Sequence, residues 1–336
     1  LGNSRVTARG RIASTIEVDA NLAPLQLGDL LPDGRGVLRG TLQLRGARNA
    51  PDIDIDLAGN DIAFGDYRAD HLQATGRLPW NAGNGALLVE ARGLQAGVPF
   101  TNLRAGLRGA VQRLQFDAEA QGEIGSLALR GDASKQGTRW QGALASLQFD
   151  PTKGAAWTLQ QPARWSWDGN SGALSRACLL SNAGGTLCAD ADWPRRGLDV
   201  KGDKLPLALL VPYLPERSDG RPWFFSGEIG LTARIVPAGN AWRGNASITS
   251  AAGGIRNRPG ARRDLVGYQD LKLDASFDPQ RIEATLGAVF NEDGRIDARV
   301  ATGWYAYAPL SGEVKIATDE LTWMELFSPD IVEPTG

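Results

Sequence analysis

Alternation of apolar and polar residues with a period of two recurs along most of this chain. The clearest case is the run 52–57, in which aspartates alternate with Ile53, Ile55 and Leu57. Successive side chains of a β-strand point to opposite faces, so this spacing places the carboxylates on one face and the aliphatic side chains on the other. The alternation therefore predicts strands with one apolar and one solvated face.

The spacing of these runs indicates how the strands are connected. They follow one another at intervals of about ten to fifteen residues, which leaves almost no room for crossover helices. A parallel sheet covered by helices on both faces would contain unbroken apolar strands, and these strands alternate instead. Gly-containing segments at 81–85, 181–185 and 291–294 are typical of turns. We therefore expect an all-β fold built from antiparallel meanders.

Composition excludes several classes of protein. Apolar residues make up 42% and charged residues 22%, so the chain can bury enough surface to fold and is not of the disordered type. Lys and Arg number 36 against 38 Asp and Glu, and the two signs are interspersed rather than gathered into a basic arm. A nucleic-acid partner is therefore not expected.

The two cysteines, Cys178 and Cys188, flank an Asn-Ala-Gly-Gly turn. Two strands folding back across that turn would bring the thiols opposite each other, which predicts a cross-strand disulfide and an oxidising compartment such as the periplasm. The alternative is two unrelated buried thiols. A metal site would need more ligands than these cysteines and the single His71 supply.

A longer repeat lies over the strand pattern. Three segments, 22–46, 205–235 and 321–336, share a short apolar run, a proline and a Gly-marked entry into a strand, although the third stops where its strand should begin. We therefore expect a piece of a longer chain. The predicted units are 1–204, with a short helix near 22–31 and the hairpin Cys178–Cys188, then 205–320, with a short helix near 205–214, and the start of a third unit at 321–336. No apolar stretch is long enough to cross a bilayer.

Catalytic and cofactor signatures are missing from the sequence. There is no G-x-S-x-G, Walker A or G-x-G-x-x-G motif. Asp52, Asp54 and Asp56 begin like a calcium loop, but Leu57 stands where the loop needs Gly and Ala63 where it needs Glu. We expect no enzymatic activity, no metal and no cofactor.

Two further groups of residues could line the edge of an apolar surface. Arg256, Arg258, Arg262 and Arg263 lie in a Gly/Pro-rich segment and could contact lipid phosphates, with a solvated loop as the alternative. Aromatic side chains could mark a lipid boundary, with core packing as the alternative, at Trp165, Trp167, Trp223, Phe224, Phe225, Trp304, Tyr305 and Tyr307.

These patterns resemble the TamB family of the AsmA-like superfamily. The resemblance rests on the Leu-rich short run followed by Pro and a Gly-marked strand, on the Gly- and Asp-rich meander, and on the segment 178–193 with Trp193 after the cysteine pair. It covers essentially the whole chain. It implies an elongated antiparallel sheet curled into an open apolar trough, called a β-taco, with a few short helices inserted at repeat boundaries.

The resemblance also implies a function. It predicts a non-enzymatic conduit of the Gram-negative periplasm that moves phospholipid between the inner and outer membranes, as part of the translocation and assembly module. The alternative is a chaperone or scaffold that assists outer-membrane protein or autotransporter assembly by β-augmentation with the TamA barrel. Expected partners are phospholipid acyl chains, the TamA-like barrel through regions mostly outside this segment, and nascent outer-membrane proteins. The inner-membrane anchor would lie outside this segment.

A one-sided apolar sheet must meet another sheet, a partner or acyl chains, because exposed apolar surface costs roughly 25 cal/mol per Å². Alternation alone leaves open whether two sheets close into a sandwich or one sheet leaves a groove. The candidate groove residues are Ile53, Ile55, Leu57, Leu87, Val89, Leu114, Phe116, Leu127, Leu129, Ile229, Leu231, Leu271, Leu273, Ile296, Val314 and Ile316.

Overall fold

A computed structural model describes residues 2–80, 83–214, 220, 222–239, 241–256, 258, 261–262, 264–290, 294–305 and 308–318. The chain divides into two compact units. Unit 1 comprises Leu1–Thr152 and Gln161–Gly169, and unit 2 comprises Lys153–Gln160 and Asn170–Gly336. Each unit is an antiparallel β-sheet, which confirms the all-β fold predicted from the alternation.

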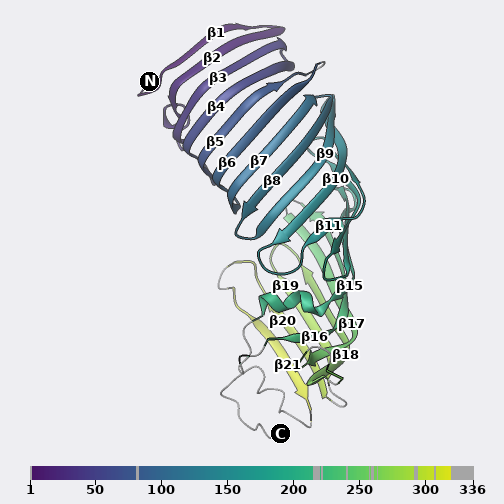
Figure 1. Ribbon diagram of the computed structural model, residues 1–336. Coiled ribbons are helices and arrows are strands. Elements are labelled where there is room, and N and C mark those ends of the chain that lie inside the picture. Colours follow the sequence, from purple (N-terminus) through teal and green to yellow (C-terminus); the bar gives the residue numbers. More distant parts are fainter. Residues whose placement is uncertain are drawn as a thin grey trace. The chain divides into compact units, whose positions relative to one another are not determined.

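Unit 1 is a meander in which each strand pairs with the next one along the chain, and β12 pairs with β10. Figure 1 shows β1 to β8 running side by side in chain order. The strands are β1 Val6–Ile12, β2 Thr15–Gln26, β3 Arg35–Ala47, β4 Ala50–Phe64, β5 Tyr67–Leu78, β6 Gly85–Ala96, β7 Val98–Ala110, β8 Arg113–Gly122, β9 Gly125–Gln136, β10 Arg139–Pro151 and β12 Ala163–Trp167.

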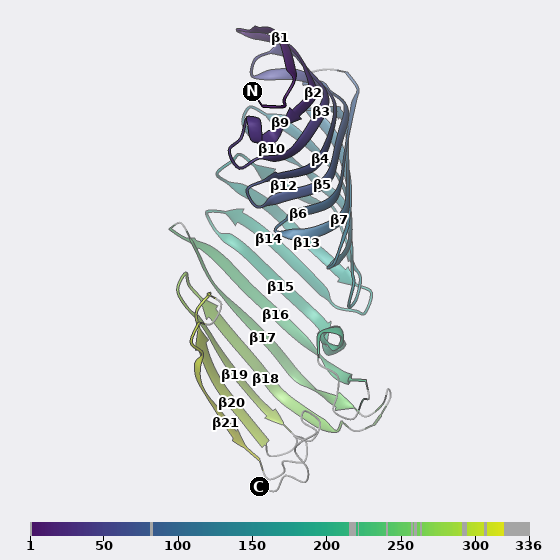
Figure 2. The same ribbon diagram turned by 90° about the vertical axis from the view of Figure 1, so that its left-hand side faces the viewer.

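Unit 2 repeats this arrangement, with β11 pairing with β13 at its start. Figure 2 shows β14 to β18 following one another across its sheet. The strands are β11 Trp157–Leu159, β13 Gly172–Ser181, β14 Thr186–Trp193, β15 Gly197–Pro206, β16 Phe224–Ala238, β17 Ala241–Arg256, β18 Val266–Phe277, β19 Ile282–Phe290, β20 Gly294–Thr302 and β21 Ser311–Ala317.

The sheet of unit 1 curls on itself. Asn49 and Ala50, at the turn between β3 and β4, line the same cavity as Gln136 and Gly137 at the turn between β9 and β10. In a flat sheet the spacing of about 4.8 Å between strands would separate β4 from β9 by about 24 Å. The two ends of this row of strands therefore approach each other across the apolar face, so the sheet forms a trough.

The tightly packed core of unit 1 is small. Leu78, Val111, Leu114 and Ala133 form a buried cluster at one end of β5 to β9, and partly buried aromatic side chains pack against it. Trp80, Phe116, Trp140 and Trp165 are among them. Most other apolar residues on the same face stay half-exposed, as expected when no second layer covers a sheet.

Helical geometry is confined to two short 3-10 helices in the described part of the chain. The helix expected near 22–31 is shorter than predicted: η1 spans Leu27–Asp29, while Leu22 and Leu25 belong to β2. Leu25 pairs with Leu38 of β3, so the sheet satisfies the backbone that a helix would otherwise hold. At the second position, η2 spans Leu207–Tyr213 with Pro212 inside it. Among the described helices, none is long and apolar enough to cross a membrane.

The predicted turn at 181–185 is present, and in it the amide of Gly184 donates to the carbonyl of Ser181 at 3.1 Å. The turns expected at 81–85 and 291–294 lie partly outside the described residues. The third predicted unit, 321–336, lies entirely outside them. The two compact units divide the chain between residues 152 and 170. A sequence-repeat boundary at residues 204 and 205 stays a prediction.

Candidate functional site

Apolar residues of unit 1 line up across the sheet in direct register. Residues directly opposite in an antiparallel pair project to the same face, so successive pairings trace a row of side chains at right angles to the strands. One row is Ala20, Leu42, Ile55, Gly76, Leu87, Leu107, Phe116, Gly131 and Leu144. A second row is Leu22, Gly40, Leu57, Ala74, Val89, Ala105, Ala118, Leu129 and Leu147. The third is Leu25, Leu38, Gly59, Leu72, Ala91, Leu103, Ala120, Leu127 and Phe149. No member is polar or charged.

Unit 2 has equivalent rows. One is Leu179, Leu187, Gly202, Leu231, Ile248, Leu273, Leu286, Ala298 and Val314. Its neighbour is Ala177, Ala189, Val200, Ala233, Ala246, Ala275, Ala284, Val300 and Gly312. We call these and the three of unit 1 the apolar rows. Each crosses its sheet from β2 to β10 or from β13 to β21.

The apolar rows are only partly covered. Most of their members are half-buried, and in the described part of the chain no large side chain is fully buried. Val314 at the end of its row is 59% exposed. A closed sandwich would bury such residues almost completely, because two inner faces interdigitate to fill the space between the sheets. The apolar rows therefore form an open surface.

The structure places most predicted groove residues on this surface. Seven candidates lie in the apolar rows of unit 1 and three in those of unit 2, namely Ile55, Leu57, Leu87, Val89, Phe116, Leu127 and Leu129, and Leu231, Leu273 and Val314. Ile53 shares their face, opposite Leu44 and Leu78. Leu114 is only 4% exposed and belongs to the buried cluster instead.

The remaining candidates lie near one end of unit 2. Ile229 is opposite Leu205, and Leu271 is opposite Ser250. Ile296 pairs with both Ala288 and Ile316, and Ile316 is 46% exposed. The binding role of all these residues stays a prediction.

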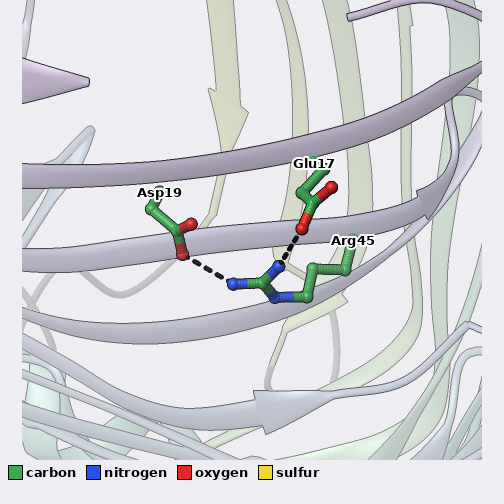
Figure 3. A network of polar contacts seen from close by, with 3 residues as sticks. All are labelled: Glu17, Asp19 and Arg45. Carbon is green, nitrogen blue, oxygen red and sulfur yellow. Dashed lines mark hydrogen bonds and ion pairs between the residues drawn. The ribbon is translucent and has the colours of Figure 1, made fainter. Parts of the chain in front are cut away.

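The opposite face of the sheet carries charges. Arg45 of β3 donates from one guanidinium nitrogen to Glu17 at 2.8 Å and from the other to Asp19 at 2.9 Å, both on β2 (Figure 3). Arg104 on β7 likewise pairs with Glu90 on β6 at 3.0 Å. These side chains are largely exposed, so the pairs contribute little stability and mark a solvated face.

The disulfide predicted between Cys178 and Cys188 is present. The two residues are register partners in β13 and β14, with their Cα atoms 4.0 Å apart. Their neighbours Leu179 and Leu187 lie in an apolar row, so the disulfide lies on the other face. It ties two strands together without occupying the apolar surface.

A polar network interrupts the apolar face near one end of unit 2, and sequence reasoning missed it. Ser250 is 5% exposed, and its hydroxyl donates to the Glu228 carbonyl at 2.7 Å and lies 2.7 Å from the Tyr268 hydroxyl. Burial raises the pKa of Tyr268, and Asp264 also raises it, whereas the hydrogen bond to Ser250 lowers it. Asp264 in turn accepts from Arg256 at 2.7 Å. The polar groups of this network are therefore hydrogen-bonded to one another.

The aromatic residues suggested as boundary markers divide into two kinds. Trp223 is 8% exposed and stacks on Phe225 at a centroid distance of 5.9 Å, which is core packing. Trp167, the last residue of β12, is 47% exposed, and Trp304, two residues after the end of β20, is 56% exposed. Tyr307 lies outside the described residues. Two further tryptophans at a strand end, Trp80 and Trp140, were not singled out from the sequence.

Of the basic segment, Arg256 is bound to Asp264, and Arg258 and Arg262 are exposed. Arg263 lies outside the described residues. No group of three or more His, Cys, Asp or Glu side chains within the described part of the chain could hold a metal ion.

Comparison with known proteins identifies the family of this chain. No solved structure matches the chain. The family model described as "TamB, N-terminal domain" matches residues 1–336, from end to end. The chain belongs to the TamB family. TamB is a transport or assembly component of the translocation and assembly module, in which TamA is its partner, and is not a known enzyme. The matched domain fits a periplasmic portion of TamB, and the open apolar rows are the candidate site of this segment.

Proposed function

We propose that this TamB segment is a non-enzymatic conduit that carries phospholipid acyl chains along its apolar rows between the inner and outer membranes. The observation that supports it is the uninterrupted register of apolar residues across each sheet, left open on its inner side. The proposed location is the periplasm, in a chain anchored to the inner membrane by a segment outside these residues.

The energetics favour an acyl chain as occupant. Each CH₂ group removed from water contributes about 0.8 kcal/mol, so twelve methylenes laid on an apolar row stand to gain at most about 10 kcal/mol, and less where one side stays open. Covering the exposed leucine and valine side chains of the rows also removes their apolar surface from water, which is favourable. Polar peptide backbones would lose hydrogen bonds with water on the same surface, because the row side chains supply no partners.

The composition of the rows also favours movement along them. The row from Ala177 to Gly312 contains only Ala, Val and Gly, and no row contains a polar group that would hold a chain at one position. An apolar chain therefore meets nearly equal surface at each strand, about 4.8 Å apart. Dispersion contacts of this kind are individually weak, so sliding from one strand to the next breaks few of them at a time.

Photo-crosslinking in cells tests the proposal. An ultraviolet-reactive amino acid at Ile55, Leu129, Leu231 or Leu273 is expected to capture phospholipid. The matched controls are the adjacent residues on the opposite face, Asp54, Arg130, Thr232 and Lys272, which should capture none. Absence of lipid at every inward position in correctly folded protein would refute the conduit.

The same experiment distinguishes the alternative function. A chaperone or scaffold for outer-membrane proteins, acting by β-augmentation with the TamA barrel, would use strand edges and not the apolar rows. Crosslinks from inward positions to polypeptide, in place of lipid, would favour that role.

A further inference from the structure

One charged side chain lies on the apolar face of β9. Leu127, Leu129, Gly131 and Ala133 occupy successive inward positions, and Lys135 continues the same alternation at the end of the strand. The inward positions of β8, β10 and β12 in this unit carry no other charge. A cation at this position marks the point at which the apolar rows give way to the rim of the trough.

Two tryptophan rings hold the ammonium group in place. Lys135 Nζ lies 4.9 Å from the ring centroid of Trp80 and 5.5 Å from that of Trp140, both within the range of a cation–π contact. Trp140 is the register partner of Lys135 on one side and of Trp167 on the other. No ion pair of Lys135 occurs within the described part of the chain. The ring faces therefore position the ammonium group and leave its N–H donors available.

Lys135 also lines a cavity. A hollow of about 650 Å³ is bounded by the turns at this end of the trough, with Asn49, Trp80, Gln112, Lys135, Gln136 and Thr138 in its wall. Ligand pockets in proteins typically have volumes of about 300 to 1,000 Å³. The wall of the cavity combines polar side chains of the turns with Trp80 and Lys135, and the next inward residue of β9, Ala133, lies opposite Leu114 in the buried cluster.

We propose that this cavity binds the phosphate of a phospholipid whose acyl chains lie on the apolar rows, with Lys135 as its cationic anchor. The inference rests on the proposed function and adds the place where the phospholipid headgroup binds. An ammonium group and a phosphate oxygen form a charge-assisted hydrogen bond, about twice as strong as a neutral one. Tryptophan rings suit the zone between headgroup and acyl chains, because they have an apolar body and one polar N–H.

The arrangement favours a lipid over other anions. A free anion would use Lys135 alone, whereas a phospholipid gains from the ammonium group and from the apolar row that crosses β9 at Gly131, two inward positions beyond Lys135. A peptide carboxylate would bring backbone amides onto a surface without hydrogen-bond partners for them. The site therefore suits a ligand that has an anionic group at one end, for Lys135, and a long apolar chain, for the apolar rows.

Short-chain lipids below their micellar concentration provide the test. Dihexanoyl phosphatidylglycerol and dihexanoylglycerol share their acyl chains and differ in the phosphate-bearing headgroup. We expect the intact chain to bind the phosphatidylglycerol about tenfold more tightly, as one charge-assisted hydrogen bond allows. Lys135→Met should abolish this preference and leave dihexanoylglycerol binding unchanged, whereas Lys135→Arg should retain it.

Controls separate the possible failures. Arg130→Met removes a cation on the opposite face of the same strand and should change neither affinity, and circular dichroism checks the fold of each variant. If both lipids bind equally and Lys135→Met changes nothing, the headgroup site is refuted while the conduit stands. If neither lipid binds, the conduit itself fails. Displacement of the phosphatidylglycerol by an equal concentration of inorganic phosphate would overturn the lipid as the source of the anion.

Discussion

Cys178 and Cys188 face each other across β13 and β14, and the disulfide that joins them lies on the face opposite the apolar rows. The stabilising disulfide and the apolar surface therefore lie on opposite faces of the same sheet. The covalent tie is placed where no acyl chain would pass, while Leu179 and Leu187 beside it remain on the apolar surface.

Removing this disulfide should weaken unit 2 without changing lipid capture. The loop it closes is short, so the chain-entropy estimate gives a loss of about 2 to 3 kcal/mol in the free energy of unfolding for the Cys178→Ser, Cys188→Ser double variant. Denaturant unfolding with and without reductant measures the loss, and the double variant should not respond to reductant. A fall in lipid crosslinking at Leu231 in the folded variant would contradict the separation of the two faces.

Gly76 should resist substitution although it lies in an apolar row. Its φ is +128°, and a Cβ there would lie 2.0 Å from the carbonyl oxygen of Ala86 on the neighbouring strand. Gly76→Ala is therefore expected to destabilise unit 1 by about 1 to 3 kcal/mol, measured by thermal or denaturant unfolding. Gly65→Asn is the matched control, because Gly65 has φ +56° with nothing within 4 Å and Asn tolerates that conformation. Equal losses in both variants would contradict the close approach of β5 and β6.

A charge placed in an apolar row should block it. Leu273→Glu introduces a carboxylate two strands from Leu231 in the same row, and covering an unpaired charge with hydrocarbon costs several kcal/mol. Lipid captured by a photo-reactive residue at Leu231 is expected to fall at least about tenfold. Lys272→Glu puts the same charge on the opposite face and should leave capture unchanged. Undiminished capture in a folded Leu273→Glu protein would rule out transit along this row.

Acid should loosen the turn between β18 and β19. The Asp278 carboxylate accepts hydrogen bonds from the amides of Gln280 and Arg281, each at 2.8 Å, and these bonds hold the pKa of Asp278 below its usual value. A lowered folded-state pKa contributes stability above the unfolded-state pKa, near pH 4, and that contribution is lost as pH falls through the folded value.

Amide hydrogen exchange at Gln280 and Arg281, followed from pH 5 to pH 2 and corrected for intrinsic exchange, measures this change. Protection should fall in the wild-type chain and stay level in Asp278→Asn, which keeps an acceptor oxygen but cannot titrate over this range. Protection that is independent of pH in the wild-type chain would show that the carboxylate does not hold the turn.

The alternation of residues along each strand predicted the structure better than did the identity of any single residue. The run from Asp52 to Leu57 has the two faces that its alternation indicates, and the cysteine pair is bridged as its turn suggests. The apolar run after Leu22 suggested more helix than exists, because sheet pairing with Leu38 overrides the preference of a short segment. Lys135 was missed because its inward position becomes evident only once β9 is known to extend to Gln136. Trp80, whose ring its ammonium group contacts, lies far from it in the sequence.

The sequence by itself determined the strands, their alternating faces and the short disulfide hairpin, because each depends on residues close together in the chain. The tertiary structure alone decided that the apolar side chains align into continuous rows, since register between strands is set by all the pairings at once. It also decided that unit 1 curls without a covering layer and that Lys135 meets Trp80 at the rim. Those outcomes depend on contacts between residues far apart in sequence, which alternation along single strands does not specify.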